Sequence, residues 1–148
     1  MHRFHTEQLL ERPVEEAFAF FSDANNLPAI TPKHLHFQIL TPGPIRIEAG
    51  ARIDYQLKLY GFPVKWATLI ESWDPPRQFV DVQLRGPYRV WRHTHRFAAE
   101  GPGTRIVDDV EYELPFGPLG RVVEALWARR EIGKIFSYRA GVISRRFS

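Results

Sequence analysis

Residues 88–114 read YRVWRHTHRFAAEGPGTRIVDDVEYEL and contain two runs of alternating side chains around one tight turn. Such alternation is typical of half-buried β-strands. We therefore predict strands over residues 88–99 and 104–114, paired as an antiparallel hairpin. In the first strand Trp91, His93, His95 and Phe97 share one face and are predicted to point inward. The other face carries arginines at positions 92 and 96, which are costly to bury.

The segments before this hairpin repeat the same pattern. Further strands are predicted over residues 2–11, 35–39, 52–60, 64–73 and 78–85. Loops and turns that contain Gly, Pro or both separate the later ones at regular intervals, which indicates sequential antiparallel pairing.

Three helices complete the predicted order of elements. Pro13 followed by Glu15 and Glu16 is a helix-start signal, so a short helix is predicted over residues 13–22. A second short helix is predicted over residues 27–30. From residue 118 the pattern is helical for about 29 residues, at the 3.6-residue period of an α-helix. Its apolar stripe consists of Leu119, Val122, Val123, Leu126, Trp127, Ile132, Ile135, Phe136, Val142 and Ile143.

The order of elements predicts one α+β domain over residues 1–148. A curved antiparallel sheet of about seven strands would wrap around the long C-terminal helix, with two short helices after the first strand. A curved sheet around one helix does not close completely. We therefore expect an apolar cavity of several hundred Å³ between them, the usual size of a ligand site.

Composition excludes several classes of protein. The 148 residues include no Cys, which rules out disulfides, thiolate nucleophiles and Cys-ligated metal centres. The sequence lacks the GxGxxG, GxxxxGK[ST], GxSxG and HExxH patterns, so nucleotide binding through these loops and the common hydrolase chemistries are not expected. The charged N-terminal residues do not resemble a signal peptide, and a cytoplasmic location is expected.

Positive charge is concentrated at the C-terminal end. Residues 118–148 contain seven basic and two acidic side chains, although the whole chain has a net charge of only +3. We interpret this segment as the solvated face of the helix and expect no nucleic-acid partner. A weak peripheral contact with an anionic membrane through this basic helix is kept as an alternative. No oligomeric state is assigned.

Several short phrases, in order along nearly the whole chain, resemble the START-like (SRPBCC) superfamily with its helix-grip fold. This superfamily includes polyketide cyclase/dehydrase-like bacterial proteins and coenzyme Q-binding proteins. The phrases are residues 12–18 and 27–32, then Gly86-Pro87-Tyr88 with Trp91 and His93, then Gly103-Thr104 with Asp108 and Tyr112, and finally residues 114–117. The resemblance implies a ligand cavity between the sheet and the long helix, and it does not establish catalysis.

His93 and His95 are the most informative polar residues on the predicted inner face. The preferred interpretation is a pair of partly buried imidazoles with backbone or acidic partners. A second interpretation makes them polar groups that orient a ligand. A third, a metal pair, needs another ligand, for which Asp81 and Asp108 are the candidates. We assign no metal site and expect no cofactor.

Asp108 lies on an otherwise apolar face of its strand and therefore needs a partner. His93 or His95 on the preceding strand would supply it, unless the register slips by one residue. Such a pair is either a structural hydrogen bond, which we prefer, or a general base. The orientation of Asp81 depends on the turn at Gly86-Pro87. A two-residue turn places it outside, opposite Arg92, and a turn one residue longer places it inside, opposite His93.

The sequence therefore predicts a protein that binds or transports an apolar or aromatic small molecule, such as a lipid, a quinone or a polyketide-like compound. The alternative is a cyclase or dehydratase that uses an inward His–Asp pair, with His93, His95 and Asp108 as candidate catalytic residues. The predicted ligand-binding residues are Trp66, Phe79, Asp81, Trp91, His93, His95, Asp108, Tyr112, Phe116, Leu126 and Phe136.

Overall fold

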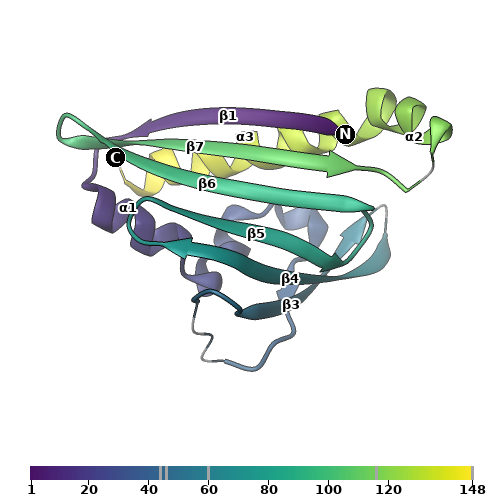
Figure 1. The fold of residues 1–148 in the computed structure, drawn as a ribbon, viewed down its shortest axis with the longest axis horizontal. Helices are drawn as coiled ribbons and strands as arrows, with labels where there is room; N and C mark the ends of the chain where they lie inside the picture. Colours follow the sequence, from purple (N-terminus) through teal and green to yellow (C-terminus); the bar gives the residue numbers. More distant parts are fainter. Residues whose placement is uncertain (44, 46, 60, 116, 148) are drawn as a thin grey trace.

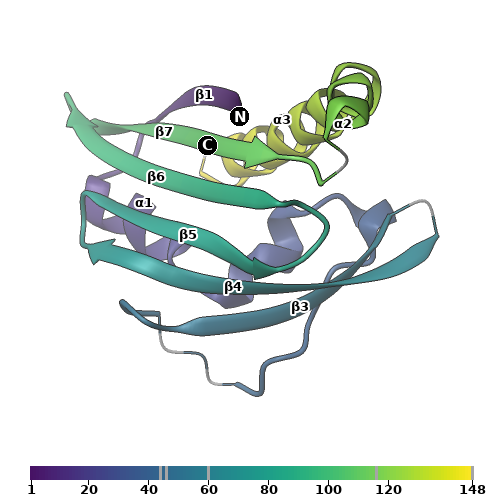
Figure 2. The same cartoon turned by 45° about the vertical axis from the view of Figure 1, so that its right-hand side comes forward.

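The computed structural model describes residues 1–43, 45, 47–59, 61–115 and 117–147. Seven antiparallel strands form one sheet in the order β1-β7-β6-β5-β4-β3-β2. The strands bend into a curved wall, and the helices lie on one side of it (Figures 1 and 2). The strands are β1 (His2–Leu10), β2 (Gln38–Ile39), β3 (Arg52–Leu59), β4 (Phe62–Asp74), β5 (Gln78–Arg85), β6 (Val90–Glu100) and β7 (Gly103–Glu113). The predicted α+β architecture is confirmed.

The segment between β1 and β3 differs from the prediction. The first helix, α1 (Val14–Phe21), is present, and the second is a 3-10 helix, η1 (Ala24–Ile30). A further 3-10 turn, η2 (Lys33–Leu35), takes the place of the start of the predicted strand over residues 35–39. His36 follows it with a left-handed φ of 48°, which breaks the extended backbone. Only Gln38 and Ile39 then pair with β3.

The β6–β7 hairpin forms as predicted and fixes the centre of the sheet. Its register pairs Trp91 with Tyr112 and His95 with Asp108. A side chain at Gly103 would place its Cβ 2.4 Å from the backbone oxygen of Leu10. This position therefore requires glycine so that the end of β1 can approach the hairpin.

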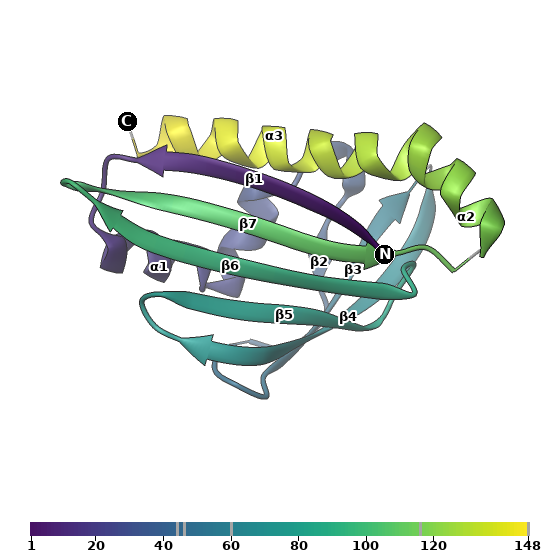
Figure 3. The ribbon, with the colours of Figure 1, turned by 45° about the horizontal axis from the view of Figure 1, so that its top comes forward.

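The C-terminal segment is helical from Pro118 to Arg146, as the sequence predicts. It consists of α2 (Pro118–Val123), one π-helical turn, η3 (Glu124–Ala128), and α3 (Arg129–Arg146). The π turn was not predicted. An extra residue in a helix shifts the apolar positions on its two sides by about 100° relative to each other. Figure 3 shows α3 along the sheet and α2 extending past its end.

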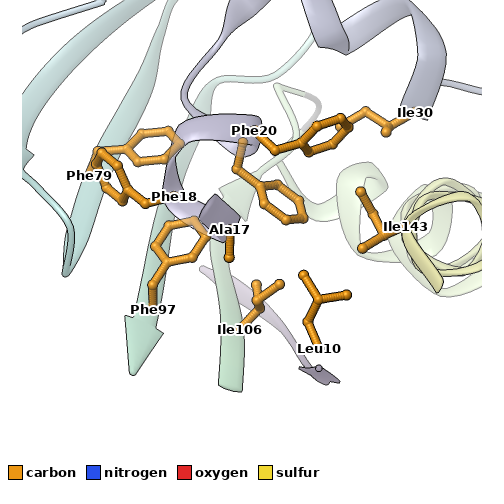
Figure 4. Packing of buried hydrophobic residues seen from close by; sticks show 10 residues of the cluster. Leu10, Ala17, Phe18, Phe20, Ile30, Phe79, Phe97, Ile106 and Ile143 are labelled. Carbon is orange, nitrogen blue, oxygen red and sulfur yellow. The ribbon is translucent and has the colours of Figure 1, made fainter. Parts of the chain in front are cut away.

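A cluster of aromatic and aliphatic side chains packs α1 against the sheet (Figure 4). The Phe18 ring meets those of Phe79 and Phe97 edge-on, with centroids 5.7 and 5.2 Å apart. Ile143 of α3 and Leu10 of β1 complete the cluster. Buried aromatic contacts of this kind hold α1 on the sheet. Within the described residues, no helix combines the length and the apolar character needed to cross a bilayer.

Candidate functional site

A cavity of about 180 Å³ lies between the sheet and the C-terminal helix. It is smaller than predicted because large aromatic side chains pack against one another in its wall. The Trp91 ring lies 5.3 Å from that of Trp66 and 4.9 Å from that of Tyr88, measured between centroids. The predicted residues that line it are Trp66, Phe79, Asp81, Trp91, His93, His95 and Phe136.

Three of the predicted ligand-binding residues do not line this cavity. Asp108 is buried behind the two histidines, and Tyr112 is fully buried with its hydroxyl donating a hydrogen bond of 2.7 Å to Glu124. Leu126 is 70% exposed. The prediction for Leu126 was wrong because it assumed an uninterrupted α-helix, and the π turn places Trp127 on the cavity side instead. Phe116 lies outside the described residues.

The C-terminal helix contributes lining residues that the sequence analysis missed. Trp127, Glu131, Ile135 and Arg139 follow one another at intervals of four residues and all face the cavity. Side chains four apart lie on the same face of a helix. Trp127 and Ile135 belong to the predicted apolar stripe but were not assigned to the cavity, whereas Glu131 and Arg139 were missed because only apolar positions were considered.

Two histidines and two aspartates form a buried polar cluster at the cavity wall. His93 Nε2 lies 2.7 Å from Asp108 Oδ1, and His95 Nε2 lies 2.6 Å from Asp81 Oδ2. An ionised carboxylate only accepts hydrogen bonds, so both imidazole nitrogens donate. The two rings stack with centroids 3.6 Å apart.

The strand registers explain how this cluster forms. The β5–β6 register places Asp81 opposite His93, and the β6–β7 register places Asp108 opposite His95. The β5–β6 connection is thus one residue longer than a two-residue turn would give, and Asp81 faces inward. Each aspartate lies close to both imidazoles, since Asp81 Oδ2 is 3.8 Å from His93 Nδ1 and Asp108 Oδ1 is 3.4 Å from His95 Nδ1.

Burial and charge set the protonation of the cluster. Burial opposes ionisation of Asp108, but hydrogen bonding and the nearby imidazoles hold its pKa well below the ordinary value. Burial likewise opposes ionisation of Asp81, and the His95 hydrogen bond lowers its pKa. Burial lowers the pKa of His93, and the charge of His95 lowers it further. Burial acts in the same direction on His95, but the two carboxylates outweigh it and raise the pKa. These shifts mean that His95 holds a proton more tightly than His93.

Two further donors at the cavity wall have buried nitrogens. Among the described residues, neither Trp66 Nε1 nor Arg139 Nε has a hydrogen-bond partner. The Arg139 guanidinium lies 5.0 Å from the centre of the Phe136 ring. Buried donors without partners cost free energy, and an acceptor on a bound molecule would relieve that cost.

The model of the family described as polyketide cyclase/dehydrase and lipid transport matches residues 10–132 of this chain. No match to a curated protein reaches significance.

Several solved structures share the fold over nearly the full length of both chains. A protein from Thermus thermophilus is 20% identical with a TM-score of 0.75, and the alignment covers 99% of this chain and 100% of that one. A START superfamily protein from Mycobacterium smegmatis is 15% identical with a TM-score of 0.74, covering 99% and 97%. Ginseng major latex-like protein 151 from Panax ginseng is 10% identical with a TM-score of 0.72, covering 99% and 97%. At these identities the likeness concerns the fold alone.

Proposed function

This chain belongs to the polyketide cyclase/dehydrase and lipid transport family, and from that membership we propose that it binds and carries an apolar or aromatic small molecule. The observation that carries the proposal is the cavity beneath the C-terminal helix. Its wall is mainly aromatic and aliphatic, and a few polar groups are placed in it. This combination is typical of small-molecule sites.

The polar groups favour a ligand with an acceptor at one end. Trp66 and Arg139 line the cavity, and each has a buried N–H without a hydrogen-bond partner among the described residues, while Ile132, Ile135 and Phe136 offer apolar surface. A lipid, a quinone or a polyketide-like compound combines an apolar body with oxygen acceptors. The carrier function needs no nucleophile, and the sequence has no Cys and no GxSxG pattern.

An uncharged fluorescent probe tests this function. N-Phenyl-1-naphthylamine should bind the wild-type protein at one molecule per chain. Ile135→Trp, which fills the cavity from α3, should weaken binding by at least about tenfold, equivalent to roughly 1.4 kcal/mol. Ser137→Trp is the matched control, because Ser137 is exposed and does not line the cavity. Equal binding by both variants, or none by the wild type, would contradict the proposal.

A second candidate function is a cyclase or dehydratase reaction. Its support is His93, a buried imidazole with a lowered pKa that lines the cavity with Asp108 behind it. A neutral imidazole held by a carboxylate is suited to remove a proton next to a carbonyl group. For an enzyme, His93→Ala should lower turnover of a polyketide panel by roughly 10²–10⁴-fold with little change in probe affinity. For a carrier, the same variant changes only affinity.

We also propose a weak contact between α2 and an anionic membrane. Leu119 and Val122 of α2 and Leu126 of η3 are exposed. Figure 3 shows that α2 extends past the end of the sheet. Arg121 is exposed on α2, and Arg129 and Arg130 are exposed at the start of α3, where Arg129 is paired with Glu124. Exposed apolar side chains with basic neighbours are suited to the boundary of a bilayer, where a carrier would collect or release its ligand.

A further inference from the structure

Three potential metal ligands converge at the wall of the cavity. One potential ligand atom each of Asp81, His93 and His95 lies within 4.8 Å of the other two. Asp81 Oδ2 is the central atom, 2.6 Å from His95 Nε2 and 3.8 Å from His93 Nδ1. Donors around a tetrahedral ion at about 2.0–2.1 Å are separated by roughly 3.3 Å. One of the two distances is shorter than this separation and the other is longer, so coordination needs rotation of the side chains and a tilt of the two stacked imidazoles toward one ion.

The three residues are held on adjacent strands of the sheet. His93 and His95 are two residues apart on β6 and so share one face, and Asp81 lies opposite His93 on β5. Ligands on strands within a sheet are positioned more accurately than ligands on loops. The inward orientation of Asp81 supplies the third ligand that the two histidines need, which the sequence left undecided.

Asp108 provides the outer contact that metal-ligating histidines require. Its Oδ1 accepts a hydrogen bond of 2.7 Å from His93 Nε2, which leaves the lone pair of His93 Nδ1 on the side of Asp81. The same oxygen is 3.4 Å from His95 Nδ1. A metal-bound histidine almost always donates its other ring N–H to a carboxylate, a backbone carbonyl or a water, and this contact fixes its tautomer and ring orientation.

We propose that Asp81, His93 and His95 form a three-ligand site for a divalent transition-metal ion of the zinc type, with Asp108 as the outer carboxylate. Two imidazoles and one carboxylate suit such an ion, and three protein ligands leave a fourth position free. That position faces the cavity, because all three ligands line it.

The charges of the surroundings are compatible with an ion. The two carboxylates balance its charge of two, and the ion replaces the hydrogen between His95 Nε2 and Asp81 Oδ2, releasing a proton. Arg139 is the basic side chain of the cavity wall and interacts electrostatically with Asp81. It therefore opposes the ion and favours an anionic or oxygen donor in the free fourth position.

This inference goes beyond the proposed carrier function and does not depend on the ligand. It changes the role of His93, since a nitrogen bound to a metal ion is not available as a general base. The ion would instead polarise an oxygen of the bound molecule.

Metal titration of the chelator-treated full chain tests the site directly. Zn²⁺ should bind at one ion per chain in calorimetry, and Co²⁺ should give the visible absorption of a four-coordinate nitrogen–oxygen site. Asp81→Asn and His95→Gln should each weaken Zn²⁺ binding by more than about 100-fold. Asp108→Asn should weaken it by roughly 10–100-fold, as expected for an outer contact.

The exposed pair of His5 and Asp109 provides the matched control. The two side chains lie 2.5 Å apart on the outer face, and His5→Gln should leave Zn²⁺ binding unchanged. Circular dichroism checks that each variant is folded. The wild-type protein alone is sufficient to overturn the proposal, if it binds no stoichiometric Zn²⁺ and gives no Co²⁺ spectrum. Loss of binding in His5→Gln, with binding retained in Asp81→Asn, would also overturn it.

Discussion

At the scale of single residues, the central feature is a pair of aspartates ionised beneath an apolar cavity. Asp108 is buried, and its charge is stabilised by His93 and His95. Removing one partner of a buried ion pair leaves the other charge without compensation, which costs about 3–5 kcal/mol. The cluster is therefore important for stability whether or not it acts on a ligand.

The first prediction concerns Asp108→Asn. This change should lower the midpoint of thermal unfolding at pH 7 by on the order of 10 °C, since 1 kcal/mol corresponds to roughly 2–4 °C in a domain of this size. Asp109→Asn is the control. Asp109 is the next residue on β7 and makes its contacts with His5 and Arg96 at the surface, where ion pairs contribute little. Equal losses in the two variants would show that Asp108 has no special role.

The pH dependence of this difference follows from the pKa of Asp108. Its folded pKa is lower than its unfolded value of 3.8, so its stabilising effect is complete above that value and is lost as the pH falls below it. The gap in unfolding midpoint between the wild type and Asp108→Asn should therefore narrow below about pH 4. Differential scanning calorimetry between pH 7 and pH 3 measures it, and a constant gap would contradict the assignment.

The inward face of β6 was predictable from the sequence, and the position of Asp81 was not. Alternation puts Trp91, His93 and His95 on one face of the strand. Because Arg92 and Arg96 on the other face are costly to bury, the first face is the inner one. The orientation of Asp81 depended on one residue in the length of a loop. A shift of one residue in the pairing register moves every side chain of a strand to the other face of the sheet. The sequence contains no signal that fixes the length of this loop.

At the scale of elements, the C-terminal helix shows that a periodic pattern predicts the helix itself but not which of its apolar side chains are buried. The pattern correctly predicts a helix from residue 118 onward, and it places Leu119, Val122 and Leu126 in the buried stripe. In the structure they are 62%, 51% and 70% exposed. The π turn at Glu124–Ala128 changes the phase, and α2 extends beyond the sheet that would cover it. Both effects come from tertiary packing.

The exposed part of α2 leads to the second prediction. The protein should sediment with anionic vesicles at low salt and only weakly with neutral ones, and salt should release it by screening. Replacing Leu119 and Leu126 by Ser should reduce the bound fraction severalfold, while the same replacement at Leu84, which is 50% exposed on β5, should not. Equal and negligible binding to both kinds of vesicle would contradict the membrane contact, and the arginines would then serve only as the solvent-exposed face of the helix.

At the scale of the whole molecule, the curved sheet and the long helix enclose a cavity that the order of elements predicted. Its volume was not predictable, because it depends on how the rings of Trp66, Tyr88 and Trp91 pack in three dimensions. The family match places the chain among polyketide cyclase/dehydrase and lipid transport proteins, and the polar cluster distinguishes one wall of the cavity from the rest.

The central claim is that this cavity holds an apolar small molecule, and native mass spectrometry of the gently purified protein tests it most directly. We expect a mass greater than that of the chain by one small molecule, which is released when the protein unfolds. Ile135→Trp should carry no such molecule, and Ser137→Trp should carry it as the wild type does. A wild-type protein that shows only the mass of the bare chain, and takes up no N-phenyl-1-naphthylamine, would contradict the claim.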